Sequence, residues 1–252
     1  MNEFEQLSSS SGRNNLKSIH GRIEVCHYDK ETGTSHPITI NANAWPAHQA
    51  HGDVQGNCSI ETVTICDQTW MLKNLDVDHY RNGDPIPEAT NREWTALTTG
   101  GWCYLDNALT NGTIYGKLYN WHAVNDPRGL APAGWHIPSK EEWETLINCL
   151  GGSAVAGGKL KEAGALHWEG FHNEATNESG FTALPGGGRS AVNGSFFGGT
   201  NNRDGYWWTT NKEFEHYSIK HMNSFSTEVS EIQQAANFGA SVRCIKDVPP
   251  SK

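Results

Sequence analysis

Residues 129–152 read GLAPAGWHIPSKEEWETLINCLGG and contain the clearest helix signal in the chain. Ser139 suits an N-cap, and Glu142 stands three residues later, where it can complete a capping box. The apolar residues that follow recur at i, i+3, i+4 and i+7, and they are Trp143, Leu146, Ile147 and Leu150. Gly151 then favours a left-handed stop. We expect a helix from Ser139 to Leu150, preceded by an extended lead-in, with a sheet packed on its apolar face.

The sequence on both sides of this helix alternates short strand patterns with Gly-rich loops. Tyr115, Leu118, Tyr119 and His122 share one face of a possible helix over residues 113–124, and residues 153–163 can form a third helix. A hairpin is expected through Ile65 and Trp70. The closing strands are expected at residues 206–210, 214–221, 225–232 and 240–246. Helices in the middle with strands at both ends predict an α+β fold with two to three helices, short antiparallel strands and many loops.

The composition excludes some classes of partner. The 252 residues include 19 basic and 28 acidic side chains, a net charge of -9, and no basic stripe. Nucleic acid is therefore not an expected partner. The chain contains no run of eighteen apolar residues, so membrane insertion is not expected. The first residues lack the apolar core of a signal peptide.

Four segments are expected along the chain. Residues 1–19 are Ser-rich and predict a disordered or extended segment. Residues 20–58 form a small unit rich in Cys and His, residues 59–247 form the main domain, and residues 248–252 are a tail. The six cysteines are an even number, which is compatible with disulfides and an oxidising compartment.

The small unit is too short to bury much surface and needs a staple. A disulfide between Cys26 and Cys58 would close both of its ends, with the histidines as polar packing. Alternatively, the unit binds zinc, because His48 and His51 would share a helical face. Cys26 and Cys58 would then complete a tetrahedral shell, and His27 and His36 are close in sequence. Both alternatives remain open at this point.

The main domain resembles the Fibrobacter succinogenes major paralogous domain family over roughly residues 60 to 247. The matching stretches include Trp70–Met71, Asn74–Leu75, His79–Pro87, Tyr115–Trp121, Ala123–Gly129, Pro132–Ser139, Glu142–Trp143, Gly157–Lys161, Ala175–Phe181, Leu184–Gly187, Tyr206–Trp208 and Ser241–Cys244. The unit before it resembles a short module of secreted proteins from environmental bacteria. The family resemblance implies a C-type-lectin-like fold of the formylglycine-generating-enzyme branch, in a secreted or cell-surface bacterial protein.

The resemblance also implies a disulfide pattern. Family members commonly have a Cys where this chain has Ala131, and that Cys would pair with the one in the last strand. Here the replacement expected is a bridge from Cys149 to Cys244, which leaves Cys66 to pair with Cys103. Enzymes of the related branch bind copper with two late cysteines. Cys244 is the only cysteine in the last hundred residues, so a metal-dependent oxidase is only a second alternative and we expect no enzymatic activity.

Ligand binding is the expected function, and lectin-like folds place the ligand face in the late segment. The candidate residues are rigid aromatic and polar side chains, namely Tyr206, Trp207, Trp208, Phe214, His216, Tyr217, Asn223 and Phe225. The expected ligand is a glycan or a surface protein. At least one of the two tryptophans should be a core residue, because neighbours on a strand face opposite sides. A structural role in a larger secreted assembly is the alternative, and Asp204 with Glu213 gives only a weak indication of calcium.

Overall fold

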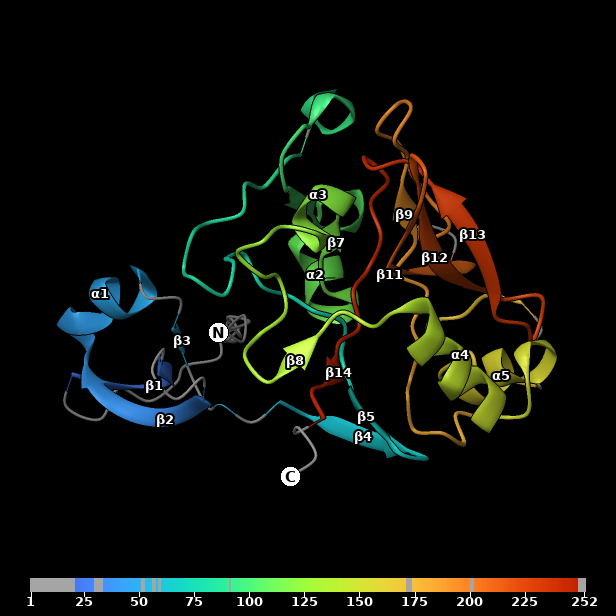
Figure 1. The fold of residues 1–252 in the computed structure, drawn as a ribbon, viewed down its shortest axis with the longest axis horizontal. Coiled ribbons are helices and arrows are strands. Elements are labelled where there is room, and N and C mark those ends of the chain that lie inside the picture. The colour runs from blue at the N-terminus through green and yellow to red at the C-terminus, as the bar shows by residue number, and fades with distance from the viewer. Residues whose placement is uncertain are drawn as a thin grey trace, which may run out of the picture.

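The computed structural model describes residues 21–29, 34–50, 53–55, 58, 60–90, 92–170, 174–199 and 202–248 (Figure 1). The predicted extended segment 1–19 lies outside these ranges. The strands are β1 (Arg22–Asp29), β2 (Thr34–Asn41), β3 (Val54–Gln55), β4 (Thr62–Ile65), β5 (Gln68–Met71), β6 (Trp102–Cys103), β7 (Leu118–Tyr119), β8 (Trp135–His136), β9 (Gly188–Arg189), β10 (Phe196–Phe197), β11 (Asp204–Glu213), β12 (His216–Asn223), β13 (Ser230–Gln234) and β14 (Ile245–Lys246). The helices are α1 (Trp45–Ala50), α2 (Leu109–Tyr115), α3 (Trp121–Val124), α4 (Lys140–Cys149) and α5 (Ser153–Leu160), with 3₁₀ turns η1 (Ala42–Ala44), η2 (Arg92–Ala96) and η3 (Leu105–Asn107). Short helices and several small antiparallel sheets confirm the predicted α+β class.

The helix α4 forms where the sequence predicts it, with both halves of the capping box. The Ser139 hydroxyl accepts from the Glu142 backbone N–H at 3.1 Å, and the Glu142 carboxylate accepts from the Ser139 N–H at 2.8 Å. The buried face carries Trp143, Leu146 and Ile147. These side chains belong to a cluster that also holds strand residues from β5, β11 and β14. The expected packing of a sheet on this helix is confirmed.

The two ends of the main domain meet in one sheet of order β4-β5-β14-β8. In β14, Ile245 pairs with Trp70 of β5 on one side and with His136 of β8 on the other. The strand β8 is part of the extended lead-in to α4. The C-terminal strand thus joins the first hairpin to the stretch that precedes the central helix, which closes the domain.

The expected helix over residues 113–124 is wrong, because the segment is broken into α2, β7 and α3. Gly116 ends α2 with a φ of 74°, a conformation that L side chains rarely adopt. A Cβ at this glycine would also lie 2.9 Å from the Leu75 carbonyl oxygen. Asn120 then starts a new helix, because its side chain accepts from the Ala123 N–H at 3.0 Å.

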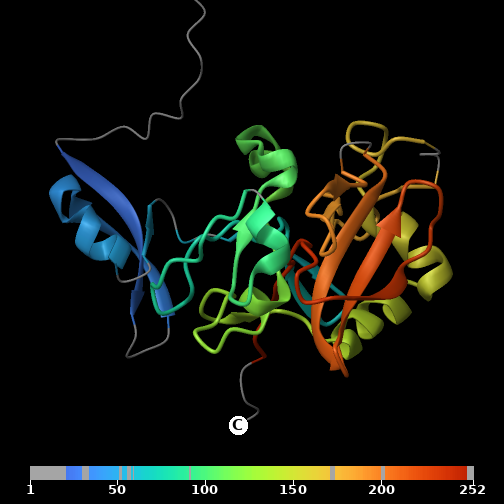
Figure 2. The same ribbon diagram turned by 90° about the horizontal axis from the view of Figure 1, so that it is seen from above.

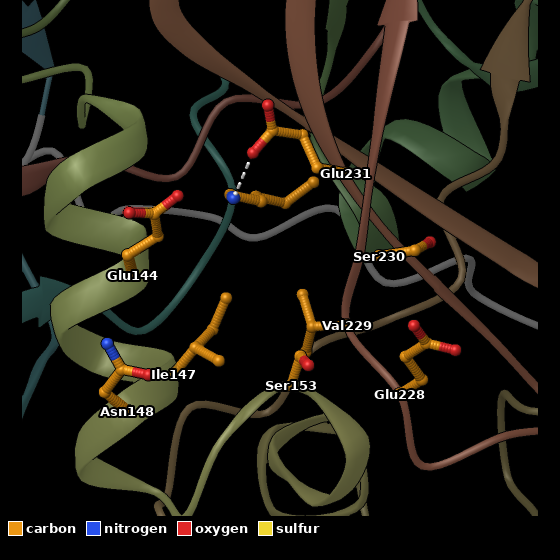
Figure 3. A pocket seen from close by; sticks show the side chains of 9 residues that line it. Glu144, Ile147, Asn148, Ser153, Glu228, Val229, Ser230 and Glu231 are labelled. Atoms are coloured by element: carbon orange, nitrogen blue, oxygen red, sulfur yellow. Dashed lines mark hydrogen bonds and ion pairs between the residues drawn. The ribbon is translucent and has the colours of Figure 1, made fainter.

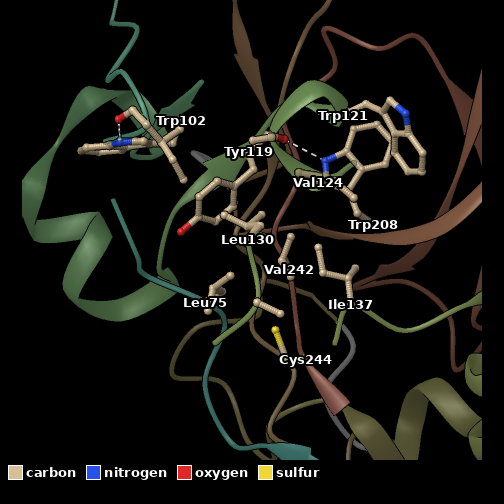
Figure 4. Close-up of a cluster of buried hydrophobic side chains, with 14 of the residues drawn as sticks. Leu75, Trp102, Tyr119, Trp121, Val124, Leu130, Ile137, Trp208, Val242 and Cys244 are labelled. Carbon is tan, nitrogen blue, oxygen red and sulfur yellow. Dashed lines mark hydrogen bonds between the residues drawn. The ribbon is translucent and has the colours of Figure 1, made fainter. Parts of the chain in front are cut away.

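The sheet of order β11-β12-β13 is covered on both faces. Figure 2 shows α4 and α5 beside this sheet, and α2 and α3 lie on the other side of the strands. Tyr206 and Trp208 of β11 pack in one hydrophobic cluster, while Trp207 between them packs in another. Figure 4 shows Trp208 next to Trp121, with its indole N–H donating to the Tyr119 carbonyl oxygen at 2.7 Å. Alternate side chains of β11 therefore enter two different cores.

His136 joins the lead-in strand to the helix and to the C-terminal segment. Its Nε2 lies 2.8 Å from the Glu142 carboxylate and its Nδ1 lies 2.7 Å from Asp247. The hydrogen bond to Glu142, followed by that to Asp247, raises the pKa of His136 above its ordinary value of 6.5. Burial opposes ionisation of Glu142, but hydrogen bonds from His136 and the Ser139 N–H outweigh it and lower the Glu142 pKa.

These two shifts predict how stability depends on pH. The His136 contribution is fully present below pH 6.5 and is lost as the pH rises through the raised folded pKa. The Glu142 contribution is present above pH 4.5 and is lost on acidification. We expect the melting temperature of His136→Gln to decline less steeply above neutral pH than that of the wild type. The corresponding difference in the free energy of unfolding should be below about 1 kcal/mol, because the ring is partly exposed. The control is His216→Gln on the exposed β11–β12 turn; equal pH profiles for all three proteins would contradict the prediction.

Candidate functional site

The predicted aromatic surface does not exist as one surface, because half of its residues are core residues. Trp207 and Trp208 are fully buried, and Tyr206 and Tyr217 are 8% and 7% exposed. The indole N–H of Trp207 donates to the Asn74 side-chain oxygen at 2.9 Å. The prediction of these four as ligand contacts is wrong, because both faces of the sheet are covered. Trp207 and Trp208 are both core residues, which agrees with the expectation that at least one would be.

The remaining predicted residues lie at opposite ends of β12. Phe214 is 93% exposed and stands with the exposed His216 at the β11–β12 turn. Asn223 and the 60% exposed Phe225 lie at the other end of the strand. A strand of 8 residues spans about 26 Å at roughly 3.3 Å per residue. The two pairs therefore cannot contact one small ligand together.

Phe225 belongs to a surface where three loops meet. Arg203 has its guanidinium 5.5 Å from the Phe225 ring centroid and pairs with Glu169 at 3.0 Å. The Ser224 N–H donates to the Arg203 carbonyl oxygen at 2.8 Å, which fixes the two loops together. Arg203 and Glu169 are about half exposed. We call Glu169, Arg203 and Phe225 the Phe225 surface.

A pocket of about 560 Å³ lies between α4, the start of α5 and the β12–β13 segment (Figure 3). It is lined by Glu144, Ile147, Asn148, Ser153, Lys220, Glu228, Val229, Ser230 and Glu231. Its apolar floor is formed by Ile147 and Val229, which belong to one buried cluster. The lining otherwise offers carboxylates, an amide, two hydroxyls and an ammonium group. We call this set the acidic pocket.

The charged groups of the acidic pocket have unequal roles. Lys220 is 3% exposed and its Nζ donates to Glu231 at 2.7 Å. Lys140 contacts the other Glu231 oxygen at 2.8 Å. Burial opposes ionisation of Glu231, but the hydrogen bonds from these two lysines outweigh it and lower its pKa. Glu144 and Glu228 are exposed at the walls, where their carboxylates can accept hydrogen bonds from a ligand.

The N-terminal unit contains a disulfide between Cys26 and Cys58. The prediction of these two cysteines as zinc ligands is therefore wrong, since a disulfide sulfur is not a thiolate ligand. His48 lies instead beside Asp53, with Nδ1 to Oδ2 at 2.7 Å, and His27 contacts the same oxygen. His51 lies outside the described residues.

The disulfide of the main domain connects Cys66 to Cys149, which contradicts both predicted pairings. Cys149 is the last residue of α4 and is exposed, whereas the buried face of this helix packs in the cluster that contains Ile245. Cys244 is the strand neighbour of Ile245 and points into the other cluster, away from the helix. The β4–β5 turn at Cys66 is on the surface and meets the end of α4 there.

Cys103 and Cys244 have free, buried thiols. They belong to different hydrophobic clusters and do not form the close pair that copper binding by two cysteines requires. Burial raises the pKa of each thiol to about 12. Both are neutral at physiological pH and are poor nucleophiles.

Asp204 and Glu213, the weak calcium candidates, stand at the two ends of β11 and do not share a site. The Asp204 carboxylate instead contacts His221 Nε2 at 2.8 Å. The sequence reasoning missed the acidic pocket altogether. The sequence carries no signal for it: Ser218 and Lys220 alternate with Tyr217 and Ile219, a pattern that predicts a solvent-facing lysine.

The fold and site define an α+β protein stabilised by disulfides, with a polar pocket on one side of a sheet that is covered on both faces. The family model of the Fibrobacter succinogenes major domain matches residues 63–246. The chain belongs to this bacterial family, as its motifs indicate. Comparison with curated proteins gives no match, and comparison with solved structures gives none either. Among the described helices, none has the length and apolar character needed to cross a bilayer.

Proposed function

We propose that this protein is a non-catalytic, extracellular ligand-binding protein with a lectin-like domain that binds glycans in the acidic pocket. The observation that carries the proposal is the composition of the pocket wall. Small-molecule pockets are usually mostly apolar with few polar groups. Here an aliphatic floor is surrounded by carboxylate, amide and hydroxyl groups. This arrangement is complementary to a sugar ring, which has an apolar C–H face and a rim of hydroxyl groups.

The charge of the pocket selects among glycans. The lining has three carboxylates and one ammonium group. The ammonium of Lys220 already pairs with Glu231. Acidic sugars would therefore meet repulsion from Glu144 and Glu228, and neutral or amino sugars would not. Two disulfides within the described residues support an extracellular location, since disulfides persist in oxidising compartments.

The proposal predicts the outcome of a glycan array with matched variants. We expect the chain to bind neutral or amino glycans, and the double variant Glu144→Ala/Glu228→Ala to bind at least about tenfold more weakly, because it removes charge-assisted acceptors. Both glutamates are exposed, so the core is unchanged. Glu215→Ala, at the β11–β12 turn and 88% exposed, is the control and should bind normally.

A second pair of variants separates the acidic pocket from the Phe225 surface. Phe225→Ala should leave glycan binding unchanged, as should Phe214→Ala at the other end of β12. Binding that survives the pocket variant but is lost in Phe225→Ala would place the ligand on the Phe225 surface and contradict the proposal. Exclusive binding of acidic glycans would also contradict it, and recovery of the chain in a particle of fixed stoichiometry without glycan binding would favour the assembly role.

A further inference from the structure

Three side chains from separate elements of the N-terminal unit converge on one point. His27 is in β1, His48 is in α1 and Asp53 comes just before β3. The Nδ1 atoms of the two histidines lie 2.8 and 2.7 Å from the same Asp53 oxygen. The two rings stand 5.6 Å apart with an interplanar angle of 79°. The candidate ligand atoms of all three residues lie within 4.8 Å of one another.

From this geometry we infer that His27, His48 and Asp53 bind one divalent transition-metal ion, of which zinc is the expected member. Imidazole nitrogen and carboxylate oxygen are zinc ligands, whereas calcium and magnesium prefer oxygen alone. Three protein ligands leave a fourth position for solvent. The site is separate from the acidic pocket and does not depend on the proposed glycan binding.

The distances fit a site that is hydrogen-bonded before the ion enters. Zinc ligands at 2.0–2.1 Å in a tetrahedron are roughly 3.4 Å apart. The observed separations of 2.7 and 2.8 Å are therefore short of the bound geometry by roughly 0.6 Å. Small side-chain rotations can supply this expansion, because both histidines are partly exposed while the Asp53 side chain is fully buried. Binding through Nδ1 would replace the two hydrogen bonds by metal bonds, and the ring proton of each neutral imidazole would then be on Nε2.

The position of the site indicates a structural role for the metal ion. The unit is a three-stranded sheet of order β2-β1-β3 with one short helix. Val25 and Cys26 are its buried apolar side chains among the described residues. The Cys26–Cys58 disulfide ties β1 to the segment after β3, but it does not hold α1. A metal ion on His48 would fasten α1 to the sheet, and small units commonly need such staples.

The test is zinc binding by the full chain after it has been stripped with a chelator, reloaded with excess zinc and dialysed. We expect one zinc ion per chain by elemental analysis, and titration should show that Asp53→Asn and His48→Gln each lower zinc affinity by more than about 100-fold. His216→Gln, a histidine outside the site, is the control and should bind zinc like wild type. The cobalt(II) form should have the visible spectrum of nitrogen and oxygen ligands without a thiolate charge-transfer band.

Further variants keep the test decisive if one of them disturbs folding. Peptide mapping shows whether the Cys26–Cys58 bridge still forms in Asp53→Asn and in His48→Gln, and a site variant without the bridge is set aside. The double variant Cys26→Ala/Cys58→Ala should keep the cobalt spectrum, since the sulfurs are not ligands. The inference is overturned if wild type binds no stoichiometric zinc, if both site variants with the intact bridge bind it normally, or if binding requires the free thiols.

Discussion

Arg243→Met is expected to lower the free energy of unfolding of the main domain by at least about 3 kcal/mol. Arg243 is 1% exposed, and within the described part of the chain its hydrogen bonds go to backbone carbonyl oxygens and to the Asn74 side chain. Its Nη1 lies 2.8 Å from the Phe181 carbonyl oxygen and 2.7 Å from that of Leu72. Methionine fills part of the volume but donates no hydrogen bond, so these buried acceptors lose their donor.

The effect is large because Arg243 joins distant parts of the chain. Its Nε donates to the Asn74 side-chain oxygen at 3.0 Å, and the same oxygen accepts from the Trp207 indole at 2.9 Å. The Asn74 amide in turn donates to the Tyr115 carbonyl oxygen at 2.9 Å. Burial lowers the pKa of Arg243 to about 9, so the side chain remains charged at pH 7. Loss of the guanidinium therefore removes the donor that connects several segments of the chain in one buried hydrogen-bond network.

The measurement is denaturant unfolding followed by tryptophan fluorescence. Arg203→Met is the matched control, because Arg203 is 45% exposed and makes a surface ion pair with Glu169. Its effect should stay below about 1 kcal/mol. Similar unfolding midpoints for the two variants would contradict the prediction, because the buried network would then stabilise the domain no more than the surface ion pair does.

Trp208→Ala is expected to destabilise the domain by about 4 kcal/mol, as for other buried tryptophans. The side chain is fully buried, and its indole N–H donates to Tyr119. Alanine leaves a cavity against Trp121 and Phe238, whose rings are 5.6 and 6.1 Å away. A loss of ligand binding in this variant would therefore report unfolding and not a lost contact.

Phe214→Ala provides the comparison, because the Phe214 side chain is 93% exposed. We expect its unfolding free energy to stay within about 0.5 kcal/mol of wild type. Thermal unfolding by circular dichroism measures both variants. A stable, fully folded Trp208→Ala protein would contradict the two-sided packing of β11.

Local signals in the sequence predicted the central helix but not the broken one. The capping box and apolar face of α4 depend on neighbours within ten residues, so the pattern was sufficient. Residues 113–124 also have a helical pattern, yet Gly116 turns the chain where Leu75 lies against it. That contact comes from a segment about forty residues away, which periodicity does not report.

The sites were harder to predict because they depend on which face a strand presents. Cys244 and Ile245 are neighbours that enter different clusters, so a sequence rule could not choose the partner of Cys149. The N-terminal unit was correctly recognised as stapled, and its disulfide was one of two alternatives. The ligand set inferred for zinc differs from the predicted one. The sequence does not indicate Asp53 as a ligand, because this residue becomes a neighbour of His27 only in the folded unit.

The central claim is that ligand binds in the acidic pocket, and hydrogen–deuterium exchange with a saturating array-selected glycan tests it most directly. We expect the ligand to slow exchange of backbone amides in residues 144–153 and 220–231, the two segments that line the pocket. The Glu144→Ala/Glu228→Ala variant should show no such protection at the same glycan concentration. Protection confined to the Phe225 surface or to the β11–β12 turn, with none in the pocket segments, would contradict the account.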